Sequence, residues 1–131
     1  MIGRSDLGRI VWLDVPDPQG GNPKRRPCLI LDITRDGTLV ANVATTSRFD
    51  PDALADDEIL LPSGAPGRPS RLGLDRPTVA KCSWLVVAPA DMATPEGPPV
   101  PRSQQVRIME RVQEMQSAGR CTAVHLSGSD N

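Results

Sequence analysis

Two short segments of the sequence place side chains that could act on a phosphate ester at the ends of apolar, strand-like runs. The first is Lys24–Pro27 (KRRP), in which Pro27 fixes its own φ and biases Arg26 toward an extended backbone, so the guanidinium leaves the chain at a defined point. The second is Thr45–Arg48 (TTSR), which offers three hydroxyls and a guanidinium at a strand end. Taken alone, the first segment is more typical of a solvated basic turn. The second, taken alone, is equally typical of β-branched residues at the end of a strand.

The two segments should converge, because the strands that carry them are expected to be antiparallel neighbours. Residues 27–33 and 38–45 have strand composition, and Arg35–Gly37 between them has turn composition. Arg26 and Thr46 each lie about ten residues from the turn centre, so antiparallel pairing brings them together at one end of the sheet. A register shift of one residue would put Thr45 or Ser47 in the place of Thr46.

An arginine beside a hydroxyl suits cleavage of a phosphodiester without a metal ion. The guanidinium neutralises charge that grows on the phosphorus oxygens, while the hydroxyl positions or relays a proton. RNA carries its own nucleophile, the 2′-OH. The protein therefore needs no histidine or covalent serine for this reaction.

Histidine and cysteine chemistry is disfavoured by the sequence. The single histidine, His125, lies in a Ser/Gly/Asp-rich tail that we expect to fray, and Cys28, Cys82 and Cys121 are too scattered to make a zinc site with it. Cys28 and Cys82 lie within apolar strand-like runs and are interpreted as small buried hydrophobic residues. We therefore expect no metal and no cofactor.

The remaining pattern predicts a small, mainly β domain with one late helix. Prolines and glycines (14 and 11) divide the chain into short segments. Beyond the two strands above, the sequence predicts strands or brief strands at Arg9–Val15, Ile59–Leu61, Arg71–Leu74 and Thr78–Val87, with an exposed loop at Asp17–Lys24.

The predicted helix runs from an N-cap at Ser103 to Ala118, with Gly119 as its stop. Its apolar stripe, which we expect to pack on the sheet, consists of Val106, Met109, Val112 and Met115 with Ile108 beside it. Residues 122–124 are expected to pair briefly. The domain is placed at residues 1–120, with 121–131 as a tail. The fold class is a strongly twisted, SH3-like antiparallel barrel with a C-terminal helix.

Charge and hydropathy exclude several classes of protein. No apolar run approaches the ~20 residues of a membrane span, and no signal-peptide stretch opens the sequence, so we expect a cytoplasmic protein without membrane contact. The net charge of −1 argues against a surface that wraps DNA. Thirteen of the 15 basic residues are arginines, which leaves a local phosphate site open. The acidic stretch Asp50–Glu58 is either a solvated loop or a segment that repels RNA or holds arginines in place of phosphate.

Four blocks in order resemble the PemK/MazF family of toxins, over about residues 7–88. They are Gly8–Pro16 (GRIVWLDVP), Arg25–Leu31 (RRPCLIL), Val40–Ser47 (VANVATTS) and Gly73–Cys82 (GLDRPTVAKC). The resemblance implies an SH3-like barrel of the PemK/MazF/CcdB kind, a homodimer, and metal-independent cleavage of single-stranded RNA. It also implies a protein antitoxin as partner.

The same resemblance implies roles for individual residues. Arg26 matches the family's catalytic arginine and Thr46 its catalytic threonine. The loop Asp17–Arg25 corresponds to the loop that borders the RNA groove. The residues expected to contact RNA are Lys24, Arg25, Ser47, Arg48, Gly20 and Gly21.

Two alternatives remain open. The chain could be an inactive or repurposed family member that binds RNA or protein, which the pair Ser83–Trp84 favours because relatives often carry an acidic residue and glutamine there. It could also be a gyrase-binding toxin of the same fold. Those relatives lack the Arg-Pro strand entry, so Arg26–Pro27 argues against that reading.

Overall fold

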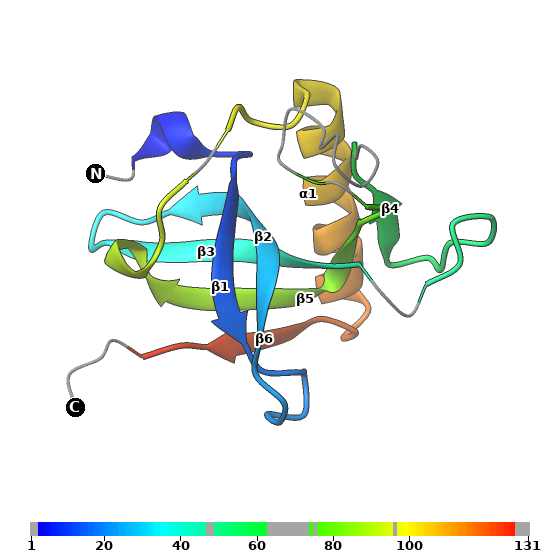
Figure 1. Ribbon diagram of the computed structural model, residues 1–131, viewed down its shortest axis with the longest axis horizontal. Coiled ribbons are helices and arrows are strands. Elements are labelled where there is room, and N and C mark those ends of the chain that lie inside the picture. Colours follow the sequence, from blue (N-terminus) through cyan, green and yellow to red (C-terminus); the bar gives the residue numbers. More distant parts are fainter. Residues whose placement is uncertain (1–2, 47–48, 63–73, 75, 96, 128–131) are drawn as a thin grey trace.

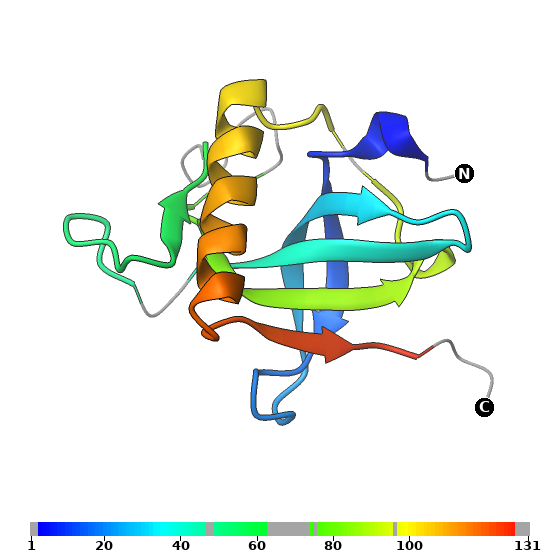
Figure 2. The ribbon, with the colours of Figure 1, turned by 180° about the vertical axis from the view of Figure 1, so that it is seen from behind.

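The fold is a twisted sheet with one long helix packed against it (Figures 1 and 2). The computed structural model describes residues 3–46, 49–62, 74, 76–95 and 97–127. Its elements in chain order are η1 (Arg4–Asp6), β1 (Ile10–Val15), β2 (Lys24–Ile33), β3 (Thr38–Thr45), β4 (Glu58–Leu60), β5 (Val79–Pro89), η2 (Ala90–Met92), α1 (Arg102–Ser117) and β6 (Thr122–His125).

The sheet confirms the expected fold class of antiparallel strands with a C-terminal helix. Its strands pair in the order β1-β2-β3-β5-β4, all antiparallel, and β6 pairs with β5 in parallel. In Figure 1, β1 crosses the direction of β3 and β5, which shows how strongly the sheet twists. Across the described residues the path runs from β1 to β4 without closing, so the sheet is twisted and open. The parallel β6 brings part of the expected tail into the fold, and His125 lies in a strand rather than in a frayed end.

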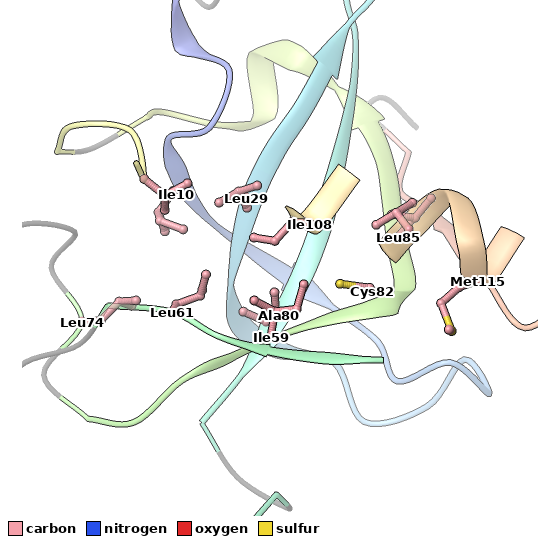
Figure 3. Close-up of a cluster of buried hydrophobic side chains, with 13 residues drawn as sticks. Ile10, Leu29, Ile59, Leu61, Leu74, Ala80, Cys82, Leu85, Ile108 and Met115 are labelled. Carbon is pink, nitrogen blue, oxygen red and sulfur yellow. The ribbon is translucent and has the colours of Figure 1, made fainter. Parts of the chain in front are cut away.

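Both faces of the sheet are buried, and β1 shows how the sequence arranges this. Alternate side chains point to opposite faces of a strand. Ile10 lies in the cluster beneath α1 (Figure 3), and Trp12 packs against that cluster. Val11, Leu13 and Val15 pack in a second cluster on the other face. The cluster beneath α1 includes Leu29, Ile59, Leu61, Ala80, Cys82, Leu85, Ile108 and Met115. The predicted alternation of β1 is therefore confirmed, with apolar contacts on each side.

The helix begins and packs slightly differently from the prediction. It starts at Arg102 rather than Ser103, because the Pro101 carbonyl accepts hydrogen bonds from the amides of Gln104 and Gln105 and no side chain caps the end. Its buried residues are Ile108, Val112 and Met115, whereas Val106 and Met109 are 45% and 37% exposed. The prediction that Val106 and Met109 face the sheet was wrong: at 3.6 residues per turn a series at every third residue drifts around the helix, so only Val112 and Met115 of that series lie on the buried face with Ile108.

The end of α1 confirms Gly119 as the stop. Gly119 has φ +69°, its amide donates to Gln116 O, and the Arg120 amide donates to Met115 O at 2.8 Å. These two bonds form a Schellman motif, in which a left-handed residue reverses the chain. The reversal directs the chain back along β5 as β6.

The segment that leads into α1 is hydrogen-bonded to the residues that precede β1. The Val100 amide donates to Gly8 O at 2.9 Å, and Arg9 Nε donates to Gly97 O at 2.8 Å. Arg9 also pairs with Asp6 at 2.7 Å. Residues next to β1 are thus held by the segment that leads into α1. Among the described residues, none of the helices has the length and apolar character needed to span a membrane.

Candidate active site

A pocket of about 570 Å³ lies where the β1–β2 loop, the start of β2, the end of β3 and the middle of β5 meet. It contains two cationic side chains from β2, a third from β5, a hydroxyl from β3 and an indole from β5. Its lining residues are Asp17, Pro18, Gln19, Asn22, Lys24, Arg26, Thr45, Lys81 and Trp84. A cavity of this size with several cations can hold a nucleotide-sized anion.

Arg26 is fixed at this pocket by two contacts. Its Nε donates to the Val15 carbonyl oxygen at 3.1 Å, and its Cζ lies 4.8 Å from the centroid of the Trp84 ring. The strand entry that carries it differs from the prediction, because β2 begins at Lys24 rather than Pro27 and residues 24–27 pair with β1. Pairing of β2 with β3 begins at Cys28. Pro27, which has no N–H to donate, therefore lies just outside the paired part of β2 and β3.

The hydroxyl that lines the pocket is that of Thr45. Cys28 pairs with Val43, and the same register continued places Arg26 opposite Thr45 rather than Thr46. Thr45 is half-buried in β3, whereas Thr46 is exposed at the bend that follows and is not among the lining residues. The predicted convergence of the Arg26 and threonine segments is therefore observed with Thr45, the residue that a one-position shift brings in.

A wide bulge in β5 brings two further side chains into the pocket. Between the pairs Asn42–Leu85 and Ala44–Ala80, β3 spans two positions and β5 spans five, so β5 carries three extra residues. Lys81 and Trp84, three positions apart, would face opposite sides of a regular strand. The bulge lets both line the same pocket.

The bulge is held by Asn42, a buried polar residue at 0% exposure. Its Nδ2 donates to the carbonyl oxygens of Lys81 at 2.7 Å and Trp84 at 3.1 Å. One carboxamide thus donates to the backbone carbonyls at both ends of the bulge, where the neighbouring strand offers no regular pairing. Its Oδ1 is buried without a hydrogen-bond partner among the described residues.

Lys81 is held from its other side by the end of the acidic segment. Its Nζ lies 3.1 Å from Glu58 Oε2 and 3.4 Å from Asp57 Oδ2. Ser83 Oγ donates to Asp57 Oδ2 at 2.6 Å, and the Ala55 amide donates to Glu58 Oε1. These contacts fix the ammonium at the rim of the pocket.

The acidic segment therefore does more than remain solvated. Besides the Asp57 and Glu58 contacts, Asp56 forms a bidentate pair with Arg120 at 2.6 and 2.8 Å, and its carbonyl accepts a hydrogen bond from Arg111. The interpretation that this segment holds basic groups is the one that these contacts favour. The arginines that it holds belong to α1 and the residues after it, not to the pocket.

The β1–β2 loop is organised by Asp17. The Asp17 carboxylate accepts hydrogen bonds from the Gly21 amide at 2.9 Å and from Asn22 Nδ2 at 3.4 Å, while the Asp17 amide donates to Gly21 O. Gly20 and Asn22 have φ of +93° and +49°, the left-handed region that such a turn uses. The loop is thus a closed, hydrogen-bonded turn at the pocket rim.

The ionised carboxylate of Asp17 should hold this turn closed down to a pH below its ordinary pKa of 3.8. The Gly21 amide, and after it Asn22, Gln19 and the charge of Arg26, hold the pKa of Asp17 below its ordinary value of 3.8. A lowered pKa means that the closed turn is favoured above pH 3.8 and loses that contribution as the pH falls through the lowered pKa. We expect the Gly21 amide resonance, followed by NMR, to titrate with a midpoint below 3.8. Asp17→Asn should remove this titration, and a midpoint at or above 3.8 would contradict the role of Asp17.

The predicted site residues are only partly brought together. Arg26 and Lys24 line the pocket, whereas Thr46 and Arg25 are exposed and do not line it. Gly20 and Gly21 do not line it either, although other residues of their loop do. Ser47 and Arg48 lie outside the described residues. Sequence reasoning missed Lys81, Trp84 and Asp17 as lining residues. Strand periodicity separates Lys81 from Trp84, so only the bulge could have revealed them.

The cysteines have the buried character expected of them. Cys28 and Cys82 are free and buried, and burial raises the pKa of each thiol to about 12. Cys121 is free and half-buried, and burial raises its pKa as well. In the described part of the chain, no group of three or more His, Cys, Asp or Glu side chains could hold a metal ion.

Comparison with solved structures identifies a protein of similar fold. No protein-family model matches the sequence, and no curated protein matches it. Among solved structures, the chain is similar to one in the crystal structure of MazE–MazF from Deinococcus radiodurans, with a TM-score of 0.55 and 19% sequence identity. The match covers 85% of this chain and 93% of that one. At this identity the likeness establishes the architecture of the sheet and helix.

Proposed function

We propose that this protein is a toxin-type, metal-independent endoribonuclease that cleaves single-stranded RNA. The observation that carries the proposal is that Arg26, Thr45 and Lys81 line one pocket on a fold shared with a chain of a MazE–MazF complex. The sequence predicted Arg26 at this place, with Thr46 beside it and Thr45 only if the register shifted by one residue.

In this proposal the RNA supplies the nucleophile. The 2′-oxygen attacks phosphorus, the bond from phosphorus to the 5′-oxygen breaks, and the proton lost from the 2′-OH is balanced by one gained at the leaving oxygen. Arg26 stabilises the charge on the phosphorus oxygens as the transition state forms. The threonine hydroxyl orients the phosphate or relays a proton. Lys24 and Arg25 hold the adjoining backbone, with Arg48, Ser47, Gly20 and Gly21 as further candidates from the sequence.

The partners proposed here follow from the same likeness. The similar structure is a complex of MazE with MazF, and we propose that this protein is likewise held by a cognate antitoxin. We further propose that it forms a homodimer and works in the cytoplasm, where single-stranded messenger RNA is its substrate.

The test is cleavage of a long single-stranded RNA in EDTA. We expect the wild-type protein to cut it, since no step above needs a metal ion. Absence of cleavage over a range of RNAs would overturn the proposal. Salt-sensitive RNA binding without cleavage would then indicate a binding module, and binding to gyrase the gyrase-directed alternative.

A matched pair of variants should identify the hydroxyl. Thr45→Ala is expected to lower kcat on the order of 10²-fold, because it removes the hydroxyl that lines the pocket with Arg26. Thr46→Ala, one residue away and exposed, should stay within a few-fold of the wild type. Single-turnover cleavage of a defined RNA measures both. The reverse order of effects would assign the role to Thr46, as the family resemblance implied.

A further inference from the structure

Trp84 lies directly against the guanidinium of Arg26, the group that the proposed reaction depends on. The Arg26 Cζ lies 4.8 Å from the centre of the indole ring. Both residues line the same pocket, although they come from strands β2 and β5, which are not neighbours in the sheet. The contact therefore joins two separate parts of the pocket wall.

The placement of the indole ring is fixed by its surroundings rather than by its own polar atom. Trp84 is 7% exposed and packs in the cluster with Val86 and Ala41. Its Nε1 is buried and has no hydrogen-bond partner among the described residues. Buried indoles usually find such a partner. The ring is thus located by packing and by the Asn42 bond to the Trp84 carbonyl, and it presents one face to Arg26.

Contact with the Trp84 ring restricts the orientation of the Arg26 guanidinium and uses none of its N–H groups. A guanidinium stacks through its planar face and donates along its edges. The Nε edge is taken by the Val15 carbonyl, which is the acceptor that the structure records for Arg26. Among the described residues no hydrogen bond takes up its two terminal amino groups, which leaves them for a ligand. A long, flexible side chain is thereby held in one orientation before any ligand arrives.

We propose that Trp84 is a positioning residue that holds the Arg26 guanidinium in its reactive orientation, and that it acts on RNA cleavage through Arg26. This inference rests on the proposed endoribonuclease function. It goes beyond that function by assigning a role to an aromatic residue that touches no reacting atom.

The first test separates turnover from binding. Trp84→Leu should lower kcat about 10- to 100-fold with KM changed less than about three-fold, because the cation remains but its orientation is lost. Trp84→Phe retains an aromatic face and should recover kcat to within about five-fold of the wild type. Each variant is first checked for folding by circular dichroism. Equal loss in Trp84→Phe and Trp84→Leu would contradict stacking.

A double-mutant cycle then tests whether Trp84 acts through Arg26. Arg26→Lys keeps a positive charge but has no planar group to stack. If the inference holds, Trp84→Leu lowers kcat much less in the Arg26→Lys background than in the wild type. An undiminished effect in that background would mean that Trp84 supports the fold alone, and would overturn the inference while leaving the ribonuclease proposal intact.

A spectroscopic measurement examines the contact without any RNA. In a Trp12→Phe background Trp84 is the sole tryptophan. Arg26→Ala should then change the intensity and red-shift the emission of Trp84, because water replaces the guanidinium on the ring face. Arg25→Ala, which alters an exposed neighbour outside the pocket, should leave the spectrum unchanged. An unchanged spectrum in Arg26→Ala overturns the inference alone, whereas a wild-type protein that cuts no RNA overturns both proposals.

Discussion

Arg26→Ala is expected to abolish nearly all RNA cleavage, with kcat lowered by about 10²–10³-fold. This is the loss measured when one preorganised donor to a developing oxyanion is removed. Arg26 is the donor that Val15 and Trp84 hold in the pocket, so its charge is the one already oriented for the reaction. The measurement is single-turnover cleavage of a defined RNA in EDTA.

The matched control for this variant is Arg25→Ala. Arg25 carries the same charge one residue away, but it is exposed and does not line the pocket. It should weaken RNA binding and its salt dependence slightly while leaving kcat almost unchanged. Cleavage that survives Arg26→Ala, or that falls equally in both variants, would show that the site has been misplaced.

Asn42→Ala is expected to cost about 2–4 kcal/mol of unfolding free energy. The substitution removes the donor that serves both the Lys81 and the Trp84 carbonyls, and leaving a buried acceptor unpaired costs about 1–3 kcal/mol. Since the β5 bulge carries two pocket residues, we also expect cleavage to fall at temperatures where the variant remains folded. Urea unfolding and single-turnover kinetics measure the two effects.

Asn42→Leu is the companion variant that separates lost hydrogen bonds from lost volume. Leucine fills the space of asparagine but donates nothing, so it should be about as destabilising as alanine. If leucine restored the wild-type stability, the cost in alanine would lie in an empty cavity. If alanine itself cost less than about 0.5 kcal/mol, Asn42 would not be what holds the bulge.

The parts of the fold that local rules specify could be predicted from the sequence. The β2–β3 hairpin was foreseen because Arg35–Gly37 forms a tight turn between two apolar runs, and Gly37 indeed has φ +85°. Gly119 was foreseen as the end of the helix for the same kind of reason. Arg26 followed from the hairpin, since a known turn fixes which residues lie at its open end.

The rest depended on contacts that periodicity does not encode. The apolar residues of the helix recur at every third position, a series that drifts around the helix, and only the position of the sheet decides that Ile108 is buried and Val106 exposed. Thr45 rather than Thr46 lines the pocket because an irregularity between Ile30 and Asp32 shifts the register of β2 on β3 by one residue from the register next to the turn. Lys81 and Trp84 were missed because a three-residue bulge breaks the alternation on which strand predictions rest.

The bond between Val100 and Gly8, with the contact of Arg9 to Gly97, has a consequence for synthesis of the chain. A ribosome adds about 5–20 residues per second, so Val100 is added roughly 5–20 s after Gly8. The nascent chain carries every pocket residue by then, yet these two bonds next to β1 are not formed. A newly made molecule therefore fixes the start of β1 only after residues 97–100 have left the ribosome, and a product truncated before them should lack both bonds.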